Sequence, residues 1–221
     1  MHASSAHAAR RPHCARCQRA ASTCLCQWAA PVAHSAEVLV LQHPMEVAHA
    51  KGTARLLHLC LPRSQLEVGE TFDAALLQQW LTAPTSCGRP AHAVLLYPDS
   101  PQDAALPLQA PPPMPAQWLT APATLRLVVM DGTWRKSRKM LYLNPLLQQL
   151  PRLPLADLPA SRYGQLRKAH AAHQLSTLEA TCAALAQIEG NAARYAPVVE
   201  AMDGWLAQQR ALWQPHAAPA H

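Results

Sequence analysis

Residues 125–141 read Leu-Arg-Leu-Val-Val-Met-Asp-Gly-Thr-Trp-Arg-Lys-Ser-Arg-Lys-Met-Leu, and this stretch decides the fold. A largely apolar, β-branched run at 125–130 ends in the carboxylate of Asp131, and a basic segment with helical spacing follows after Gly132. In α/β proteins, a charged group at the carboxyl end of a buried strand faces the crevice where ligands bind. Asp131 alone could equally cap a helix. The adjoining Thr133-Trp134 pair and the run of cations favour a site for an anionic partner.

Strands that alternate with helices predict an α/β fold. We expect strands at 37–42, 91–97 and 125–130, with a further short strand at 151–155. We expect helices at 44–60, 73–81, 134–143, 180–189 and 197–213. The sequence Ser176-Thr177-Leu178-Glu179 has the pattern of a capping box ahead of the fourth of these helices. With 221 residues, the chain is long enough for one α/β domain and a small appendage.

Composition divides the chain into three parts. We predict a disordered segment at 1–11, a four-cysteine zinc knuckle at 12–34 and an α/β domain at 35–215, which contains a proline-rich loop at 98–122. No run of 18 uncharged apolar residues exists, so we expect no transmembrane helix. The first eleven residues lack the apolar core of a secretory signal, so we expect a cytoplasmic protein.

Four of the seven cysteines lie close together, as Cys14-x2-Cys17-x6-Cys24-x-Cys26. Four thiolates at this spacing can complete one tetrahedral zinc site and fold a segment too small to have its own core. Such a closed site would be structural rather than catalytic. The alternative is four incidental cysteines. Cys60, Cys87 and Cys182 are scattered, and we expect them to be core residues or neutral ones.

Positive charge is concentrated in two regions of a chain whose net charge is +6. Residues 126–168 carry nine Lys or Arg against two acids, and residues 10–19 carry four arginines, among them Arg16 and Arg19, with no acid. Concentrated basic regions indicate a polyanionic partner, most simply a nucleic acid, although a solvated basic face would look the same. No Gly-x-Gly-x-x-Gly or Walker loop occurs, so a nucleotide-like cofactor would not use the usual glycine fingerprint.

Three further segments lie at the ends of expected elements. In His43-Pro44-Met45-Glu46 the spacing of His and Glu does not define a metal site, and a structural histidine is the favoured interpretation. Leu96-Tyr97-Pro98 ends a strand and could form the floor of a pocket. Ser176 at a helix amino terminus could bind a carboxylate or phosphate, or simply cap the helix.

Together these segments resemble the DTW-domain family, which is named for its Asp-x-Thr-Trp motif. The resemblance spans about residues 14–182 and consists of several motifs in order. They are the cysteine cluster, His43-Pro44-x-Glu46, Leu96-Tyr97-Pro98, Asp131-Gly132-Thr133-Trp134 with its basic helix, Tyr163-x-x-x-Arg167-Lys168 and Leu175-Ser176-Thr177-x-Glu179-Ala180.

The resemblance implies a tRNA-uridine aminocarboxypropyltransferase. Such enzymes move the 3-amino-3-carboxypropyl group of S-adenosylmethionine to N3 of a tRNA uridine and release methylthioadenosine. It also implies a SPOUT-like fold with a knotted C-terminal cofactor site, which is an exception to the rule that chains are not knotted.

The residues expected to carry this function form four sets. The catalytic set is Asp131, as general base or orienting group, with Thr133 and Trp134. The S-adenosylmethionine set is Leu96, Tyr97, Pro98, Tyr163, Arg167, Lys168, Leu175, Ser176 and Thr177, with the carboxylate of the transferred group near Ser176, Thr177 or Arg167. The tRNA set is Arg135, Lys136, Arg138, Lys139, Arg16 and Arg19, and the zinc set is Cys14, Cys17, Cys24 and Cys26.

Three other functions fit the same motifs. A SPOUT-type RNA methyltransferase would use the same cofactor but transfer methyl, and a noncatalytic zinc-knuckle protein would bind RNA without a cofactor. The same transfer could also act on ribosomal RNA. The protein is expected to be a monomer or a homodimer.

Overall fold

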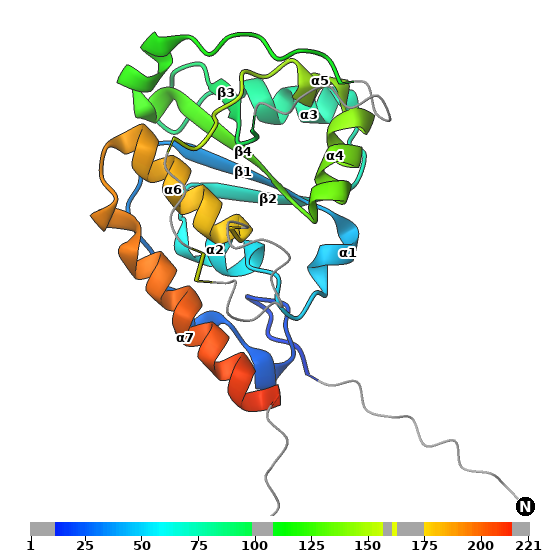
Figure 1. Cartoon of the computed structure of the whole chain (residues 1–221), viewed down its shortest axis with the longest axis vertical. Coiled ribbons are helices and arrows are strands. Elements are labelled where there is room, and N and C mark those ends of the chain that lie inside the picture. Colours follow the sequence, from blue (N-terminus) through cyan, green and yellow to red (C-terminus); the bar gives the residue numbers. More distant parts are fainter. Residues whose placement is uncertain (1–11, 99–107, 157–160, 163–174, 214–221) are drawn as a thin grey trace, which may run out of the picture.

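The fold is built on one parallel sheet of four strands in the order β2-β1-β4-β3 (Figure 1). It is seen in a computed structural model that describes residues 12–98, 108–156, 161–162 and 175–213. The strands are β1 (Glu37–Gln42), β2 (Ser64–Val68), β3 (His92–Leu95) and β4 (Leu125–Asp131). The expected mixed α/β class is therefore confirmed. The expected knotted C-terminal cofactor site includes Tyr163, Arg167 and Lys168, which lie outside the described residues, so the knot stays a prediction.

The two central strands have nearly continuous apolar sequences because both of their faces are covered. Val38 and Val40 pack into one hydrophobic core, on one face of the sheet, while Leu39 and Leu41 pack into a second core on the other face. The register places Gln42 beside Asp131 at the carboxyl ends of β1 and β4. Two polar side chains therefore meet where the buried strands end.

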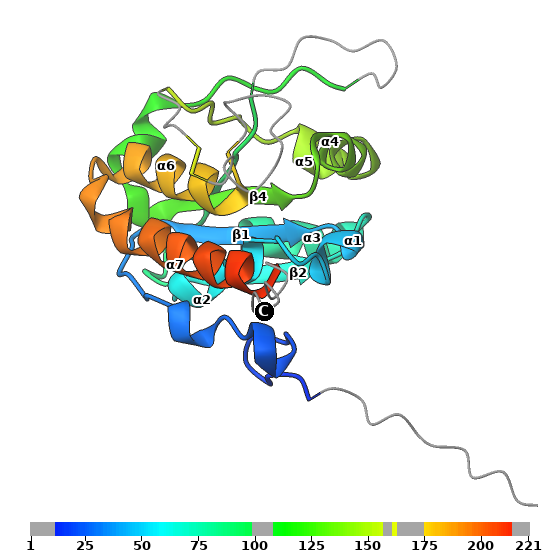
Figure 2. The same ribbon diagram turned by 60° about the horizontal axis from the view of Figure 1, so that its bottom comes forward.

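Helices cover the sheet in two layers (Figures 1 and 2). The first layer contains α2 (Ala54–Cys60), α6 (Thr177–Glu189) and α7 (Ala196–Trp213). The second contains α3 (Ala74–Thr82), α4 (Trp134–Leu143) and α5 (Pro145–Gln148). Among the described helices, none is long and apolar enough to cross a membrane.

Polar side chains cap the starts of α3 and α6, and the second of these caps is the one predicted. The Asp73 carboxylate accepts a hydrogen bond from the Leu76 amide at the start of α3. Ser176 and Glu179 form both hydrogen bonds of the predicted capping box at the start of α6. Gly190 ends α6 in the left-handed region, with φ of 64°, where a side chain would be strained.

Several boundaries differ from the sequence prediction. The helix expected at 44–60 is two helices, α1 (Pro44–Val47) and α2, separated by a turn at 48–53. Residues 151–155 form no strand but one bridge, Leu95 to Arg152. The described part of the proline-rich segment contains a short 3-10 helix, η3 (Ala116–Thr120), and a second one, η4 (Pro122–Thr124), begins at its last residue.

The N-terminal segment packs against the α/β domain (Figure 2). It contains the short 3-10 helices η1 (Ala21–Thr23) and η2 (Cys26–Trp28), and η6 (Ala193–Tyr195) precedes α7. The Trp28 indole donates a 2.6 Å hydrogen bond to Gln208 on α7. Arg19 donates to the carbonyls of His49, Ala50 and Gly52 in the 48–53 turn. Arg19 therefore supports the turn that splits the expected helix.

Gly204 on α7 is the contact point for Trp28. A Cβ atom there would lie 2.3 Å from the Trp28 ring. A glycine in a helix normally gains about 1 kcal/mol when changed to alanine. We predict that Gly204→Ala instead lowers the free energy of unfolding by roughly 1–3 kcal/mol, because it forces the Trp28 ring away. Denaturant unfolding measures this change.

The matched control is the same substitution in a Trp28→Leu background, where the clash is removed. There Gly204→Ala should be neutral or stabilising. Stabilisation by Gly204→Ala in the unaltered chain would contradict the predicted packing.

Candidate active site and metal centre

The candidate active site lies at the carboxyl ends of β1 and β4. The chain leaves β1 into α1 and α2 and leaves β4 into α4, and α2 and α4 pack on opposite faces of the sheet, so the two strand ends border a topological switch point. Asp131 closes β4 here with only 5% of its surface exposed. Its Oδ2 accepts a 2.8 Å hydrogen bond from the Gln42 amide, and its Oδ1 accepts a 2.6 Å bond from the Thr177 hydroxyl. One carboxylate thus joins β1, β4 and the start of α6.

Burial determines the proton affinity of Asp131. It raises the pKa of the carboxyl above its usual 3.8, because burial disfavours the charged form. Hydrogen bonds from Thr177 and Gln42 offset part of this rise, while the nearby Glu46 adds to it. A carboxylate with a raised pKa is a stronger base than an exposed one, so Asp131 is suited to accept or orient a proton.

Two aromatic residues follow the ends of β3 and β4. Trp134 begins α4 and stacks on Tyr97, with ring centroids 5.0 Å apart and planes 12° apart. Tyr97 is buried, whereas Trp134 is 50% exposed. Thr133 is the N-cap of α4, and its hydroxyl accepts from the Lys136 amide. The DTW segment therefore combines a buried carboxylate at the end of β4 with an exposed, supported indole three residues later in the chain.

The expected cofactor residues fall into two groups. Leu96, Tyr97 and Pro98 follow β3, and the Leu96 amide donates to the Val128 carbonyl of β4. At the other segment Thr177 reaches Asp131, as described, while Ser176 caps α6 and donates to the Met202 sulfur. Leu175 is half-buried ahead of this turn. Tyr163, Arg167 and Lys168 lie outside the described residues.

The cations of α4 do not share one environment. Lys136 pairs with Glu46 at 2.7 Å, and Lys139 pairs with Glu70 at 3.0 Å. Hydrogen bonds from Lys139 and His43 lower the pKa of Glu70, so Glu70 stays ionised. Arg135 is exposed and Arg138 is half-buried. Lys136 and Lys139 are thus each held by a carboxylate from elsewhere in the domain.

The N-terminal arginines also differ. Arg16 is exposed, whereas Arg19 is half-buried and lies over the Trp205 ring at 5.2 Å in addition to its three carbonyl bonds. His43 is buried at the start of α1, where its Nδ1 accepts from the Met45 amide and its Nε2 donates to Glu70. These contacts agree with the structural role expected of this histidine.

Sequence reasoning missed two polar residues of the site. Gln42 shows only as a polar residue at the end of an apolar run, and its role depends on the register between β1 and β4. Arg152 is buried beside the Tyr97 ring, with its Cζ 5.1 Å from the ring centroid. Its signal is a single arginine between two prolines and leucines, in a stretch that otherwise predicts a short strand.

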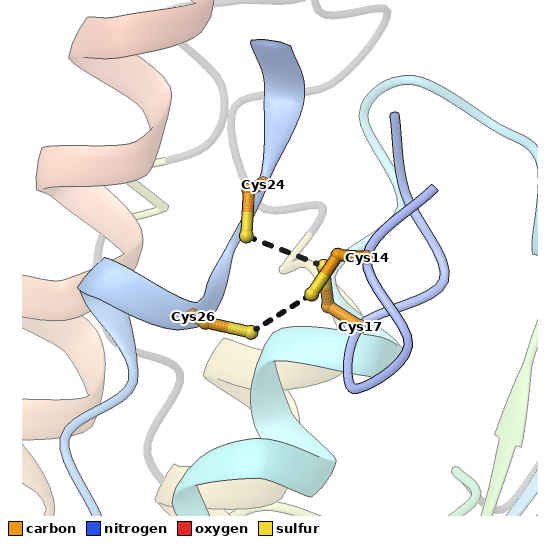
Figure 3. A group of neighbouring side chains, drawn as sticks. All are labelled: Cys14, Cys17, Cys24 and Cys26. Carbon is orange, nitrogen blue, oxygen red and sulfur yellow. Dashed lines mark hydrogen bonds between the residues drawn. The ribbon is translucent and has the colours of Figure 1, made fainter. Parts of the chain in front are cut away.

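The four clustered cysteines converge in space (Figure 3). Cys14 and Cys26 have their sulfur atoms 3.6 Å apart, and Cys17 and Cys24 have theirs 3.7 Å apart. All four sulfurs lie within 4.8 Å of one another. Tetrahedral zinc with bonds of about 2.3 Å holds sulfurs about 3.8 Å apart. The cluster therefore has nearly the dimensions of a four-thiolate zinc site.

One thiol of the cluster, that of Cys14, is acidic enough to bind a metal as a thiolate. Amide groups of Cys17 and Arg16 lower the pKa of Cys14 to about 6, so one thiolate forms readily. Cys60 and Cys182 are buried core residues, and Cys87 is exposed. The four sulfurs of the cluster are thus the described cysteines that fit a metal.

The chain belongs to the DTW-domain family, because the family model described as the DTW domain matches residues 11–210. Curated relatives agree with this membership. A mouse protein named tRNA-uridine aminocarboxypropyltransferase 2 is 30% identical over 189 residues, covering 84% of this chain and 59% of its own. The Drosophila melanogaster protein of the same name is 30% identical over 188 residues, covering 81% and 68%.

An Arabidopsis thaliana protein named tRNA-uridine aminocarboxypropyltransferase A is 28% identical over 137 residues, covering 59% of this chain and 50% of its own. The chain spans about three fifths of the length of the mouse and Macaca fascicularis relatives that it matches. No solved structure matches the chain.

We predict that the purified protein holds one zinc ion per chain and that Cys17→Ser loses it, because three thiolates and a hydroxyl bind zinc poorly. Elemental analysis with a colorimetric chelator titration measures the content. Removing the metal should also lower the melting temperature, since the knuckle packs on α7.

The matched control is Cys87→Ser, which replaces an exposed cysteine outside the cluster. It should leave the zinc content and the melting temperature unchanged. Full zinc content in Cys17→Ser would overturn the assignment of this site.

Proposed function

We propose that this protein transfers the 3-amino-3-carboxypropyl group of S-adenosylmethionine to N3 of a uridine in tRNA and releases methylthioadenosine. The observation that supports this most directly is the buried Asp131 carboxylate at the end of β4, followed three residues later by the exposed Trp134 indole, in a chain of the DTW-domain family. The names of the matching relatives support the same reaction.

The proposed chemistry uses Asp131 on the acceptor. Uridine N3–H is a weak acid, so the reaction needs a group that takes or orients its proton. As the proton passes to Asp131, the N3 electron pair attacks the carbon next to the sulfonium. The carbon–sulfur bond breaks, its electrons remain on sulfur, and the neutral thioether methylthioadenosine leaves. Because the sulfonium is a good leaving group, orientation of the two substrates supplies much of the rest.

Trp134 is proposed to bind the base. Flipped or single-stranded bases commonly stack on aromatic rings. Trp134 has half of its surface exposed, and Tyr97 supports its ring from within the protein. Thr133, at the start of α4, would contact the base edge or hold the Asp131 segment in place.

The donor is proposed to bind between the 96–98 edge and the 175–177 turn, with Tyr163, Arg167 and Lys168 completing the site. The knotted SPOUT-like arrangement belongs to this proposal, since a parallel sheet with its site at the strand ends is compatible with it. Zinc is proposed as a structural ion that holds the knuckle, supported by the spacing of the four sulfurs.

Phosphate contacts are proposed for Arg135, Lys136, Arg138, Lys139, Arg16 and Arg19. The contacts that these side chains make within the protein indicate which of them are available to phosphates. Arg135 and Arg16 are exposed, whereas Lys136 and Lys139 are paired with carboxylates and Arg19 donates to backbone carbonyls. Exposed arginines therefore should contribute more to tRNA binding than the paired lysines.

Mass spectrometry of nucleosides tests the function directly. Unmodified tRNA incubated with the protein and S-adenosylmethionine should yield uridine heavier by one aminocarboxypropyl group, together with methylthioadenosine. A gain of one methyl would identify a methyltransferase instead. Binding of tRNA without modification would indicate a noncatalytic RNA-binding protein. A product found only on ribosomal RNA would show that ribosomal RNA is the substrate.

We predict that Asp131→Ala and Asp131→Asn both abolish most of the transfer. In the unaltered protein the rate should fall at acid pH, because protonated Asp131 cannot act as a base. Since burial raises this pKa, the fall should centre above pH 3.8. Thr177→Val removes a hydrogen bond that lowers the pKa, so the fall should move to higher pH.

Thr120→Val is the matched control, since its hydroxyl serves the 3-10 helix η3. It should leave the pH profile unchanged. Full activity in both Asp131 variants would exclude Asp131 as the base, and an unmoved profile in Thr177→Val would contradict the assigned pKa.

We predict that Arg135→Gln weakens tRNA binding and reduces the slope of log affinity against log salt by about one unit. Lys136→Gln should change that slope less, because Lys136 is already paired with Glu46. Binding titrations at several salt concentrations measure both slopes. Equal slopes for Arg135→Gln and the unaltered chain would remove Arg135 from the interface.

A further inference from the structure

Arg152 is held rigidly beside the candidate site. Residues 151–153 run along the free edge of β3, where the Leu95 amide donates to Pro151 and the Leu153 amide donates to Leu95. The Arg152 Nη1 donates a 3.1 Å hydrogen bond to the Pro98 carbonyl, and its Cζ lies 5.1 Å from the Tyr97 ring centroid. Backbone pairing thus aims the guanidinium at the 96–98 edge.

This guanidinium has no carboxylate partner among the described residues, although it is only 6% exposed. Its buried Nε donates to no described group, and Nη2 makes no hydrogen bond there either. Arg126, which is also buried, has its charge compensated in the usual way, because two of its nitrogens donate to the Glu37 carboxylate. A buried cation without an anionic partner is costly.

A second buried polar atom lies on the side chain that Arg152 contacts. The Tyr97 hydroxyl is buried and has no hydrogen-bond partner in the described part of the chain. Burial raises the pKa of Tyr97 to about 12, although Arg138 and Arg152 oppose this rise, so the hydroxyl stays protonated and can donate. Arg152 and Tyr97, which contact each other, therefore both have hydrogen-bond donors without a described acceptor, and Trp134 stacks on the same Tyr97 ring.

We propose that Arg152, assisted by the Tyr97 hydroxyl, binds the α-carboxylate of the donor's aminocarboxypropyl group. This inference rests on the proposed function and specifies the binding of its donor. The Nε–Nη2 edge of a guanidinium meets a carboxylate through two parallel hydrogen bonds. A buried position suits a small carboxylate better than a phosphate of the tRNA backbone, which binding proteins meet at exposed cations.

This assignment differs from the sequence expectation for the carboxylate. Ser176 uses its hydroxyl to cap α6 and to reach Met202, and Thr177 donates to Asp131. Both hydroxyls therefore already donate to other groups, whereas the Nε and Nη2 atoms of Arg152 donate to no described group. A carboxylate fixed at Arg152 would hold the transferred chain beside Tyr97 and Trp134, so the carbon that reacts, rather than the methyl group, would be turned towards the stacked base.

The test compares two donors in calorimetric titration: S-adenosylmethionine and decarboxylated S-adenosylmethionine, which lacks only the carboxylate. The unaltered protein should bind the first more tightly. Arg152→Gln should weaken S-adenosylmethionine binding roughly ten- to hundredfold and leave the decarboxylated donor nearly unchanged. Arg152→Lys should restore part of the preference, since it keeps the charge but not the planar fork.

Two further variants complete the design. Tyr97→Phe removes only the hydroxyl and should reduce the preference severalfold, which keeps the test available if Arg152→Gln does not fold. Arg63→Gln replaces an exposed arginine at the opposite end of the sheet and should change neither affinity.

Each outcome decides the matter. Equal weakening of both donors by Arg152→Gln, or unchanged discrimination with weaker tRNA binding, would overturn the carboxylate role in favour of a structural or phosphate role. Equal binding of both donors by the unaltered protein would overturn the carboxylate role of Arg152. The proposed function would then still be decided by the mass spectrometry of the product. Failure to bind either donor, without product, would overturn both.

Discussion

The buried carboxylate of Asp131 is the interaction on which the site and much of the fold depend. Its two oxygens accept from β1 and from the start of α6, so three elements far apart in the sequence meet at one charged group. A carboxylate removed from water is stable only when such donors compensate for the lost hydration. The same removal from water raises its pKa. The folded protein therefore loses stability as the pH rises through that pKa, because the buried carboxyl group becomes charged. This loss falls at the position where the proposed reaction needs a base.

The sequence predicts the central strands and the capped helices because their signals are local. A continuous apolar run between breaks identifies β1 and β4, and Ser176 with Glu179 identifies the start of α6. The edge strand β2 is missed because it has only two apolar residues in an alternating, half-exposed pattern. The break at 48–53 is missed because it depends on Arg19, about 30 residues away, whose bonds exist only in the folded chain.

The candidate site shows the same division. The cysteine cluster and Asp131 follow from residue type and spacing, since metal ligands and strand ends carry recognisable patterns. Charge along the chain predicts a single basic helix, but the carboxylates that pair with its lysines come from other segments, Glu46 from α1 and Glu70 from the loop after β2. Arg152 could not be singled out, because its importance lies in the hydrogen bonds that it does not make with described residues, and no sequence pattern contains that information.

The contacts of Arg19 and Trp28 make the small N-terminal unit inseparable from the rest. A fragment starting after residue 34 would leave three carbonyls of the 48–53 turn without their donor and uncover the α7 surface around Gly204. The knuckle is therefore not an independent module that could be exchanged between proteins without the rest of this domain. Any replacement would have to bring an arginine and an aromatic ring in the same places, so the two parts are constrained to change together.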